Sequence, residues 1–128
     1  MAYHLILLAH GSSDPQWREP FETFHRTLRQ RLATPVHLAY MELSEPSLES
    51  TVAGLADEGA AELEVLPLFF AAGRHLRKDV PAQIDALRHK HPHVSLTLLP
   101  PVGEHPAFVD ALATVIAEQA GESSHLGG

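Results

Sequence analysis

Hydrophobic runs and helix-like stretches alternate four times along this chain. The runs cover residues 3–9, 36–41, 62–70 and 95–99, and their length and content of leucine, isoleucine and valine are typical of buried strands. Between and after them, apolar residues recur every three or four positions, the period of an amphipathic helix. A strand–helix unit repeated in this way predicts an α/β fold with a four-stranded parallel sheet, right-handed crossovers and helices on both faces.

Proline, glycine and aspartate positions suggest where the helices begin and end. The first helix should end before Pro35, and the second should run from Pro46 to Glu58 with Gly59 as its C-cap. We expect Asp79 to cap the third helix with Pro81 in its first turn, and the last helix to occupy residues 106–119. The apolar stripe predicted for the first helix consists of Trp17, Phe21, Phe24, Leu28 and Leu32.

Length and composition narrow the class of protein. With 128 residues, 45% of them hydrophobic, the chain suits one domain over residues 1–120, followed by a flexible tail at 121–128. No apolar run approaches the roughly 20 residues of a membrane span, and the N-terminus lacks the plan of a signal peptide, so we expect a cytoplasmic protein that does not bind membranes. The net charge of −7 argues against nucleic acid as a partner.

Three side chains at the ends of the predicted strands are the first candidates for chemistry. His10 follows the first hydrophobic run, Glu42 the second and His75 the third. Because the carboxyl ends of parallel strands share one edge, where α/β folds bind ligands, the three should lie near one another. The chain has no cysteine, so thiolate zinc sites and cysteine-ligated iron–sulfur clusters are excluded. Imidazole and carboxylate together suit a borderline transition metal.

Each of these residues also has an ordinary structural interpretation. A histidine at a strand end often only bonds a backbone carbonyl, and His75 could be a solvated loop residue. Glu42 is the more informative one, because a carboxylate buried after a strand requires a cation or hydrogen-bond donors.

Further polar residues are expected in the same loops as candidates for substrate binding. Backbone and hydroxyl groups after Gly11 could bind a carboxylate or phosphate near a helix start. The basic residues after the third strand form either a solvated cluster or an anchor for anionic groups. The histidine before Pro106 either contacts substrate or is a plain loop residue. These candidates are Ser12, Ser13, Arg74, Arg77, Lys78 and His105.

Two other enzymatic interpretations are weaker. Histidine phosphatases place an arginine-histidine-glycine triplet at the end of the first strand, but Ala9 stands where that arginine would be. A phosphohistidine mechanism needs positive charge around the phosphoryl group, and this strand supplies none. A nucleotide-binding loop is not indicated either, because Gly11 stands alone without a G-x-G-x-x-G or Walker pattern.

Three segments together resemble the small sirohydrochlorin chelatases. They are residues 7–12 (LLAHGS), 42–48 (ELSEPSL) and 67–75 (PLFFAAGRH) followed by Asp79-Val80-Pro81. This is the short CbiX type of class II chelatase, which is close to the sirohydrochlorin ferrochelatases. The resemblance covers about residues 3–118, and the three motifs occur in the order and at the spacing typical of the family.

The resemblance implies a chelatase-like three-layer fold and a lyase that inserts Co²⁺, or alternatively Fe²⁺, into sirohydrochlorin for cobalamin or sirohaem biosynthesis. Imidazole and carboxylate ligands would also suit Ni²⁺. His10 and His75 match the metal-binding histidines of the family, and Glu42 matches their acidic partner. Longer relatives contain two units in tandem, so a homodimer is expected here. The histidine-rich tract and iron–sulfur motif of some relatives do not occur in this sequence. A non-catalytic carrier of metal or tetrapyrrole is the alternative function.

Overall fold

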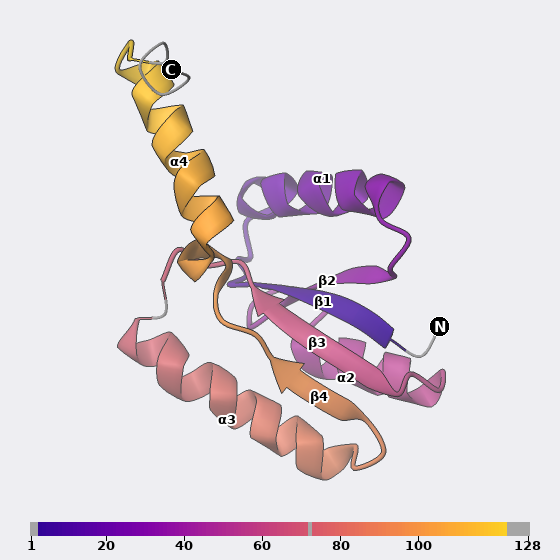
Figure 1. Ribbon diagram of the computed structural model, residues 1–128. Helices are drawn as coiled ribbons and strands as arrows, with labels where there is room; N and C mark the ends of the chain where they lie inside the picture. The colour runs from indigo at the N-terminus through magenta and orange to yellow at the C-terminus, as the bar shows by residue number, and fades with distance from the viewer. Residues whose placement is uncertain (1–2, 72, 123–128) are drawn as a thin grey trace.

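The computed structural model describes residues 3–71 and 73–122, with the backbone alone at residues 74 and 75. Its four strands form one parallel sheet in the order β2-β1-β3-β4. The elements along the chain (Figure 1) are β1 (Tyr3–Ala9), α1 (Pro15–Arg31), β2 (Val36–Tyr40), α2 (Leu48–Asp57), β3 (Glu62–Pro67), α3 (Arg74–Lys90), β4 (Ser95–Leu98), the 3₁₀ turn η1 (Val102–Glu104) and α4 (Pro106–Gln119).

Helices cover both faces of the sheet, which confirms the predicted three-layer fold (Figure 1). On one face, Ile6 and Leu8 of β1 pack with Val52 of α2 and Ile84 of α3 in the larger core cluster. On the other face, Leu7 and its neighbours form a smaller cluster beneath α1. The alternation of side chains along β1 divides the two clusters, because successive residues of a strand point to opposite faces.

The face beneath α1 is the less completely covered of the two. The predicted stripe of α1 is only partly correct: Phe21 and Leu28 pack against the sheet, whereas Trp17, Phe24 and Leu32 are 71%, 46% and 42% exposed. Phe21 and Leu28 lie seven residues apart, or about two helical turns. The helix therefore packs a narrower strip against the sheet than its sequence predicts. α4 leaves the carboxyl end of the sheet and points away from it (Figure 1), with no buried residue of its own.

The helices begin and end for local reasons. Asp14 accepts a hydrogen bond from the Gln16 amide at 2.9 Å, and Ser47 accepts one from the Ser50 amide at 3.0 Å, so both side chains satisfy amides in a first turn. The C-cap of α2 is Glu58 rather than the predicted Gly59. Gly59 follows it at φ +90°, the conformation that glycine adopts most easily just after a helix end. The predicted second helix is thus confirmed, with Ser47 rather than Pro46 at its start.

The prediction for the third helix was wrong at its start. α3 begins at Arg74 after Gly73, so Asp79 is inside the helix and does not cap it, and Pro81 lies beyond the first turn. Val80, Ile84 and Leu87 are all buried on one side of the helix. This continuous apolar stripe holds the backbone helical across a proline that would otherwise interrupt it. β3 also ends at Pro67, three residues earlier than predicted.

No helix within residues 3–71 and 73–122 is long and apolar enough to cross a membrane.

Candidate metal centre at the carboxyl edge of the sheet

The loops after β1 and β2 lie directly against each other. Gly11, which follows His10, has φ +103°, and a Cβ atom placed there would lie 1.9 Å from the Glu42 carbonyl oxygen. Only a residue without a side chain allows this close approach, and glycine also tolerates the positive φ. Backbone contact at this one position therefore fixes the loop of His10 against the loop of Glu42.

Hydrogen bonds hold the same two loops together. The Met41 amide donates to the Ala9 carbonyl at 3.0 Å. Three residues further along each loop, the Ser12 amide donates to the Ser44 hydroxyl at 3.0 Å, and that hydroxyl donates to the Ser12 carbonyl. Ser44 was not among the predicted site residues, and its role is to join the loops. His10 and Glu42 both have exposed side chains where these two loops meet, at the rim of the sheet. The expectation that Glu42 is buried after its strand was therefore wrong, because the chain leaves the sheet at Met41 and the carboxylate faces solvent.

The loop after β3 completes the rim. The Leu68 amide donates to the Leu8 carbonyl at 2.9 Å, so the chain stays beside β1 after β3 ends. Phe69 then lies edge to face with the His10 ring, at 6.2 Å between centroids and an interplanar angle of 70°. The backbone of His75 lies in the first turn of α3, and its side chain is outside the described part. Among the side chains that are described, no group of three or more histidines and carboxylates is arranged to hold a metal.

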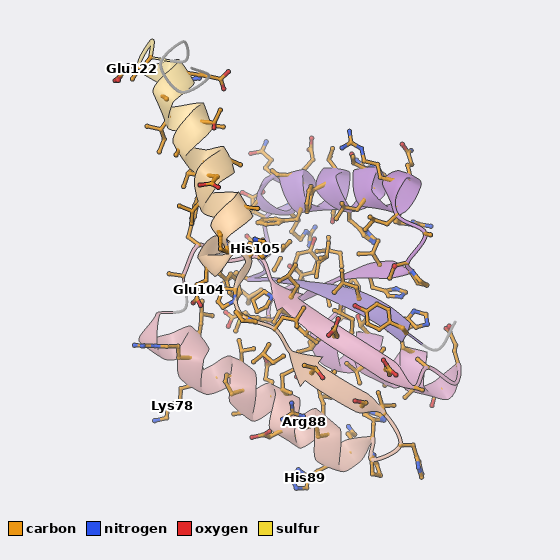
Figure 2. The ribbon with its side chains drawn as sticks, viewed as in Figure 1. Lys78, Arg88, His89, Glu104, His105 and Glu122 are labelled. Atoms are coloured by element: carbon orange, nitrogen blue, oxygen red, sulfur yellow. The ribbon has the colours of Figure 1, made fainter. Side chains whose placement is uncertain are left out.

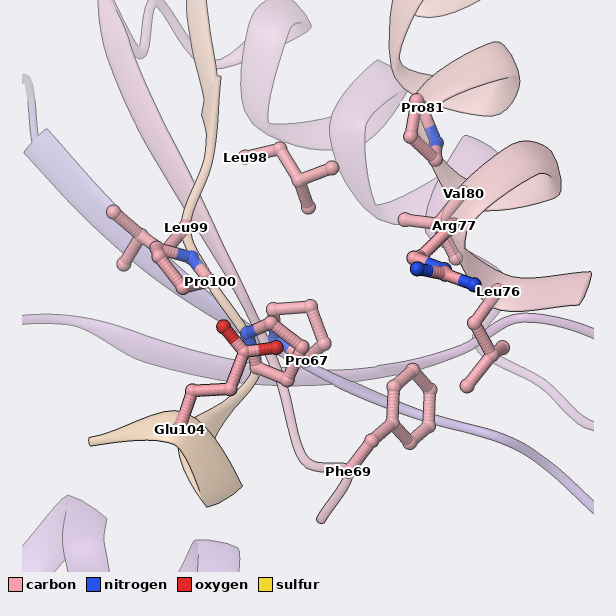
Figure 3. A pocket seen from close by; sticks show the side chains of 11 residues that line it. Pro67, Phe69, Leu76, Arg77, Val80, Pro81, Leu98, Leu99, Pro100 and Glu104 are labelled. Atoms are coloured by element: carbon pink, nitrogen blue, oxygen red, sulfur yellow. The ribbon is translucent and has the colours of Figure 1, made fainter. Parts of the chain in front are cut away.

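An apolar hollow of about 350 Å³ lies between the ends of β3 and β4 and the start of α3. Proline, leucine and valine side chains form most of its wall, with Phe69 on one side (Figure 3). Arg77 and Glu104 are the charged residues that line it. A hollow of this kind can accept a flat apolar body, with the Arg77 guanidinium available to a carboxylate at its edge.

A second hollow, of about 500 Å³, opens beside Glu42 between α2 and α3. Glu49 and Asp79 line it together with Glu42. Gln83 crosses it, since its amide nitrogen lies 3.2 Å from a carboxylate oxygen of Glu49. The loops at this edge of the sheet therefore lie beside an acidic surface at Glu42. At Arg77 they lie beside a surface with both positive and negative charge.

The remaining predicted residues have varied surroundings. The Ser12 hydroxyl accepts from the Asp14 amide at 3.0 Å and so helps to hold its own loop, while Ser13 is exposed. His105 accepts from the Ala107 amide at 3.1 Å and caps α4. Lys78 projects from the outer side of α3, away from the sheet (Figure 2). Of the predicted basic cluster, Arg77 lines the hollow, and the side chain of Arg74 lies outside the described part.

A sequence model of the family called CbiX matches residues 4–119. The chain belongs to the CbiX family. Among relatives, the sirohydrochlorin cobaltochelatase of Sulfolobus acidocaldarius is 30% identical over 108 residues, which cover 84% of this chain and 85% of that one. That of Sulfurisphaera tokodaii is 27% identical, covering 91% and 92%.

Solved structures of similar proteins share the fold of this CbiX-family chain. A crystal structure of a protein described as a cobalamin biosynthesis CbiX protein, from Marinobacter aquaeolei VT8, is 43% identical with a TM-score of 0.84, covering 94% of this chain and 99% of that one. SirB from Bacillus subtilis, solved with Fe³⁺, is 23% identical with a TM-score of 0.78. The match covers 92% of this chain and 47% of SirB.

Proposed function

We propose that this CbiX-family protein is a chelatase that inserts Co²⁺ into sirohydrochlorin. The observation that supports the proposal is the close approach of Gly11 to the Glu42 carbonyl, which brings the loops of His10 and Glu42 together at one edge of the sheet. The relatives named as sirohydrochlorin cobaltochelatases match the chain over most of their length and indicate the reaction.

In this proposal, His10 and His75 bind the incoming metal on one side of the macrocycle. Imidazole ligands suit Co²⁺, Fe²⁺ and Ni²⁺ and can leave coordination positions open for the ring nitrogens. Metallation also releases two pyrrole protons. Glu42 is exposed at the same rim and is the carboxylate we assign to binding the metal or accepting a proton.

The tetrapyrrole would lie with one edge in the hollow beside Phe69. Sirohydrochlorin is flat and carries carboxylate side chains, and Arg77 lines the hollow as a bidentate partner for one of them. Arg74 and Ser13 remain proposed substrate contacts at the same rim. Ser12 and His105 already serve as a loop contact and a helix cap, and Lys78 projects from α3 away from the sheet (Figure 2). We therefore propose that these three residues contribute less to substrate binding than Arg77.

An absorption assay tests the function directly. Sirohydrochlorin and Co²⁺ are mixed with and without the protein, and the spectral change on metallation is followed. We expect the protein to accelerate metallation well above the uncatalysed rate. Parallel assays with Fe²⁺ and Ni²⁺ rank the metals. Binding of sirohydrochlorin or metal without acceleration of metallation would instead identify a carrier.

We further propose that the active form is a homodimer built on the exposed face around α1 and α4. A hollow of about 540 Å³ there is lined by apolar side chains, among them Phe24, Phe70 and Phe108. A substrate rich in carboxylates does not fit such a lining, whereas an apolar surface of a second copy does. Ile116 of α4 is 58% exposed and extends this surface along the helix.

The oligomeric state tests the second proposal. Light scattering coupled to gel filtration should give twice the mass of one chain for the unmodified protein. Ile116→Glu should shift the mass towards that of a monomer, because it introduces a charge into the apolar surface. Thr114→Glu adds the same charge on another side of α4 and should leave the dimer intact. A monomeric mass for the unmodified protein would refute the proposal.

A further inference from the structure

The imidazole of His10 needs something to hold it, because the hydrogen bonds of its loop involve other groups. His10 is exposed, and in the part of the chain that the structure describes its side chain forms no hydrogen bond. An exposed imidazole on a loop samples several rotamers, and a metal ligand works best when its rotamer is fixed beforehand.

Phe69 supplies the ring contact. Its centroid lies 6.2 Å from that of His10, with the two rings inclined at 70°. This is the edge-to-face arrangement that aromatic rings favour. Phe69 also lines both the 350 Å³ hollow beside Arg77 and the 540 Å³ apolar hollow beneath α1, so its ring forms a partition between them next to His10.

Phe69 is itself held from three directions. Its neighbour Leu68 stays in register with β1 through the bond from its amide to the Leu8 carbonyl. The Phe69 carbonyl accepts from the Gly103 amide at 2.9 Å. A Cβ on Gly103 would lie 1.8 Å from the Phe70 carbonyl oxygen, so η1 presses closely on this loop. The ring packs against the larger core cluster.

We propose that Phe69 is a positioning residue that fixes the His10 imidazole for metal binding. The inference rests on the proposed function, in which His10 is a metal ligand. The Phe69 ring is held in place by β1, η1 and the core. Contact with this ring therefore restricts the rotamers of the His10 imidazole. Metal affinity and the geometry of the bound metal should therefore depend on an aromatic ring at position 69.

The test uses Co²⁺ alone as the probe, because its visible absorption reports coordination geometry. Co²⁺ is titrated into the unmodified protein and into Phe69→Leu, Phe69→Tyr and His10→Ala, and the His10-dependent signal is taken as the difference from His10→Ala. Phe69→Leu should weaken that binding about three- to tenfold, the range expected for loss of one aromatic pair, and should change the band shape. Phe69→Tyr keeps the ring and should restore both.

Val94→Ala serves as the packing control. Val94 is a buried residue beyond the far end of α3, just before β4, so truncating it lowers stability without touching the rim. It should leave the Co²⁺ spectrum unchanged. Unchanged Co²⁺ affinity and band shape in folded Phe69→Leu would overturn the inference, as would an equal change in Val94→Ala.

Failure of the proposed function is recognised separately. If the unmodified protein binds Co²⁺ through His10 but does not accelerate sirohydrochlorin metallation, the function is wrong while the effect of Phe69 on binding can still be seen. If metallation is fast and Phe69→Leu impairs sirohydrochlorin binding with unchanged Co²⁺ binding, Phe69 contacts the tetrapyrrole and the positioning role is wrong.

Discussion

The two ends of the sheet use histidine in opposite ways. At the amino end, His4 Nδ1 lies 2.9 Å from His37 Nε2, and the ring centroids are 5.1 Å apart. The rings meet nitrogen to nitrogen and share one hydrogen bond, which occupies both of those nitrogens. At the carboxyl end, His10 is exposed and has an aromatic neighbour instead of a hydrogen-bonding one. The same side chain is thus available for chemistry at one end and engaged at the other.

The backbone explains this difference. His4 and His37 lie on the two paired strands, whose register runs from Leu5 opposite Val36 to Ala9 opposite Tyr40, so the sheet itself sets their separation. His10 follows the last paired residue of β1, where the chain turns at Gly11. Beyond the paired strands a side chain is placed by loop contacts, and these leave it open to a ligand.

Replacing His10 should have the largest effect. We expect His10→Ala to reduce sirohydrochlorin metallation with Co²⁺ by more than about 100-fold, since loss even of a group that supports a metal ligand costs about 10- to 100-fold. His37→Gln changes a histidine at the other end and should retain a rate within a few-fold of the unmodified protein. Near-normal turnover in His10→Ala would show that the carboxyl end is not the reaction site.

Replacing Gly11 tests the contact between the loops. Gly11→Ala would place a Cβ 1.9 Å from the Glu42 carbonyl oxygen at φ +103°, so the loops must separate. We expect the free energy of unfolding to fall by about 2 kcal/mol or more, and metallation to fall with it.

Gly54→Ala is the matched control for this substitution. A Cβ there would meet nothing within 4 Å, and alanine favours the helix by up to about 1 kcal/mol. Urea unfolding should therefore show opposite changes for the two variants. Equal stability of Gly11→Ala and the unmodified protein would mean that the close approach does not hold the loops together.

The amino-acid sequence was sufficient to predict the strands and the edge at which His10 and Glu42 lie, because long apolar runs and the rule for parallel sheets determine both. It was insufficient where contacts between residues distant in sequence determine the local structure. Packing of Val80 with the core, for example, overrides the start signal at Asp79 and the break expected at Pro81.

Two parts of the candidate site were missed for a related reason. Phe69 belongs to an apolar run that reads as strand, so nothing local indicates that its ring meets His10. Ser44 joins the loops by contacts 32 residues apart in sequence. Gly11 was noticed as a loop glycine, but its close approach to Glu42 depends on the pairing of β1 with β2 and has no sequence pattern of its own.

We expect the smallest effect on the pH dependence of stability, which involves the pair of His4 and His37. Burial lowers the pKa of His37 below its ordinary value of 6.5, and the neighbouring His4 and His25 lower it further. The groups that act on His37 are His4 on β1, His25 and Arg29 on α1, and Glu58 at the end of α2, of which Glu58 alone raises the pKa. The folded protein therefore holds His37 neutral at a pH where the unfolded chain would protonate it.

Stability should consequently decrease on the acid side of neutrality. Well above pH 6.5 His37 is neutral in both states and costs no stability. As the pH falls through 6.5 towards the lower pKa of the folded state, the unfolded chain takes up a proton first and the folded state loses stability relative to it. Urea unfolding at pH 7.5, 6.5 and 5.5 should show a steeper decline for the unmodified protein than for His37→Gln. His89→Gln, at an exposed position on α3, should keep the steeper decline. Equal slopes for the unmodified protein and His37→Gln would mean that folding does not make His37 harder to protonate. The two ends of the sheet would then differ in metal binding alone.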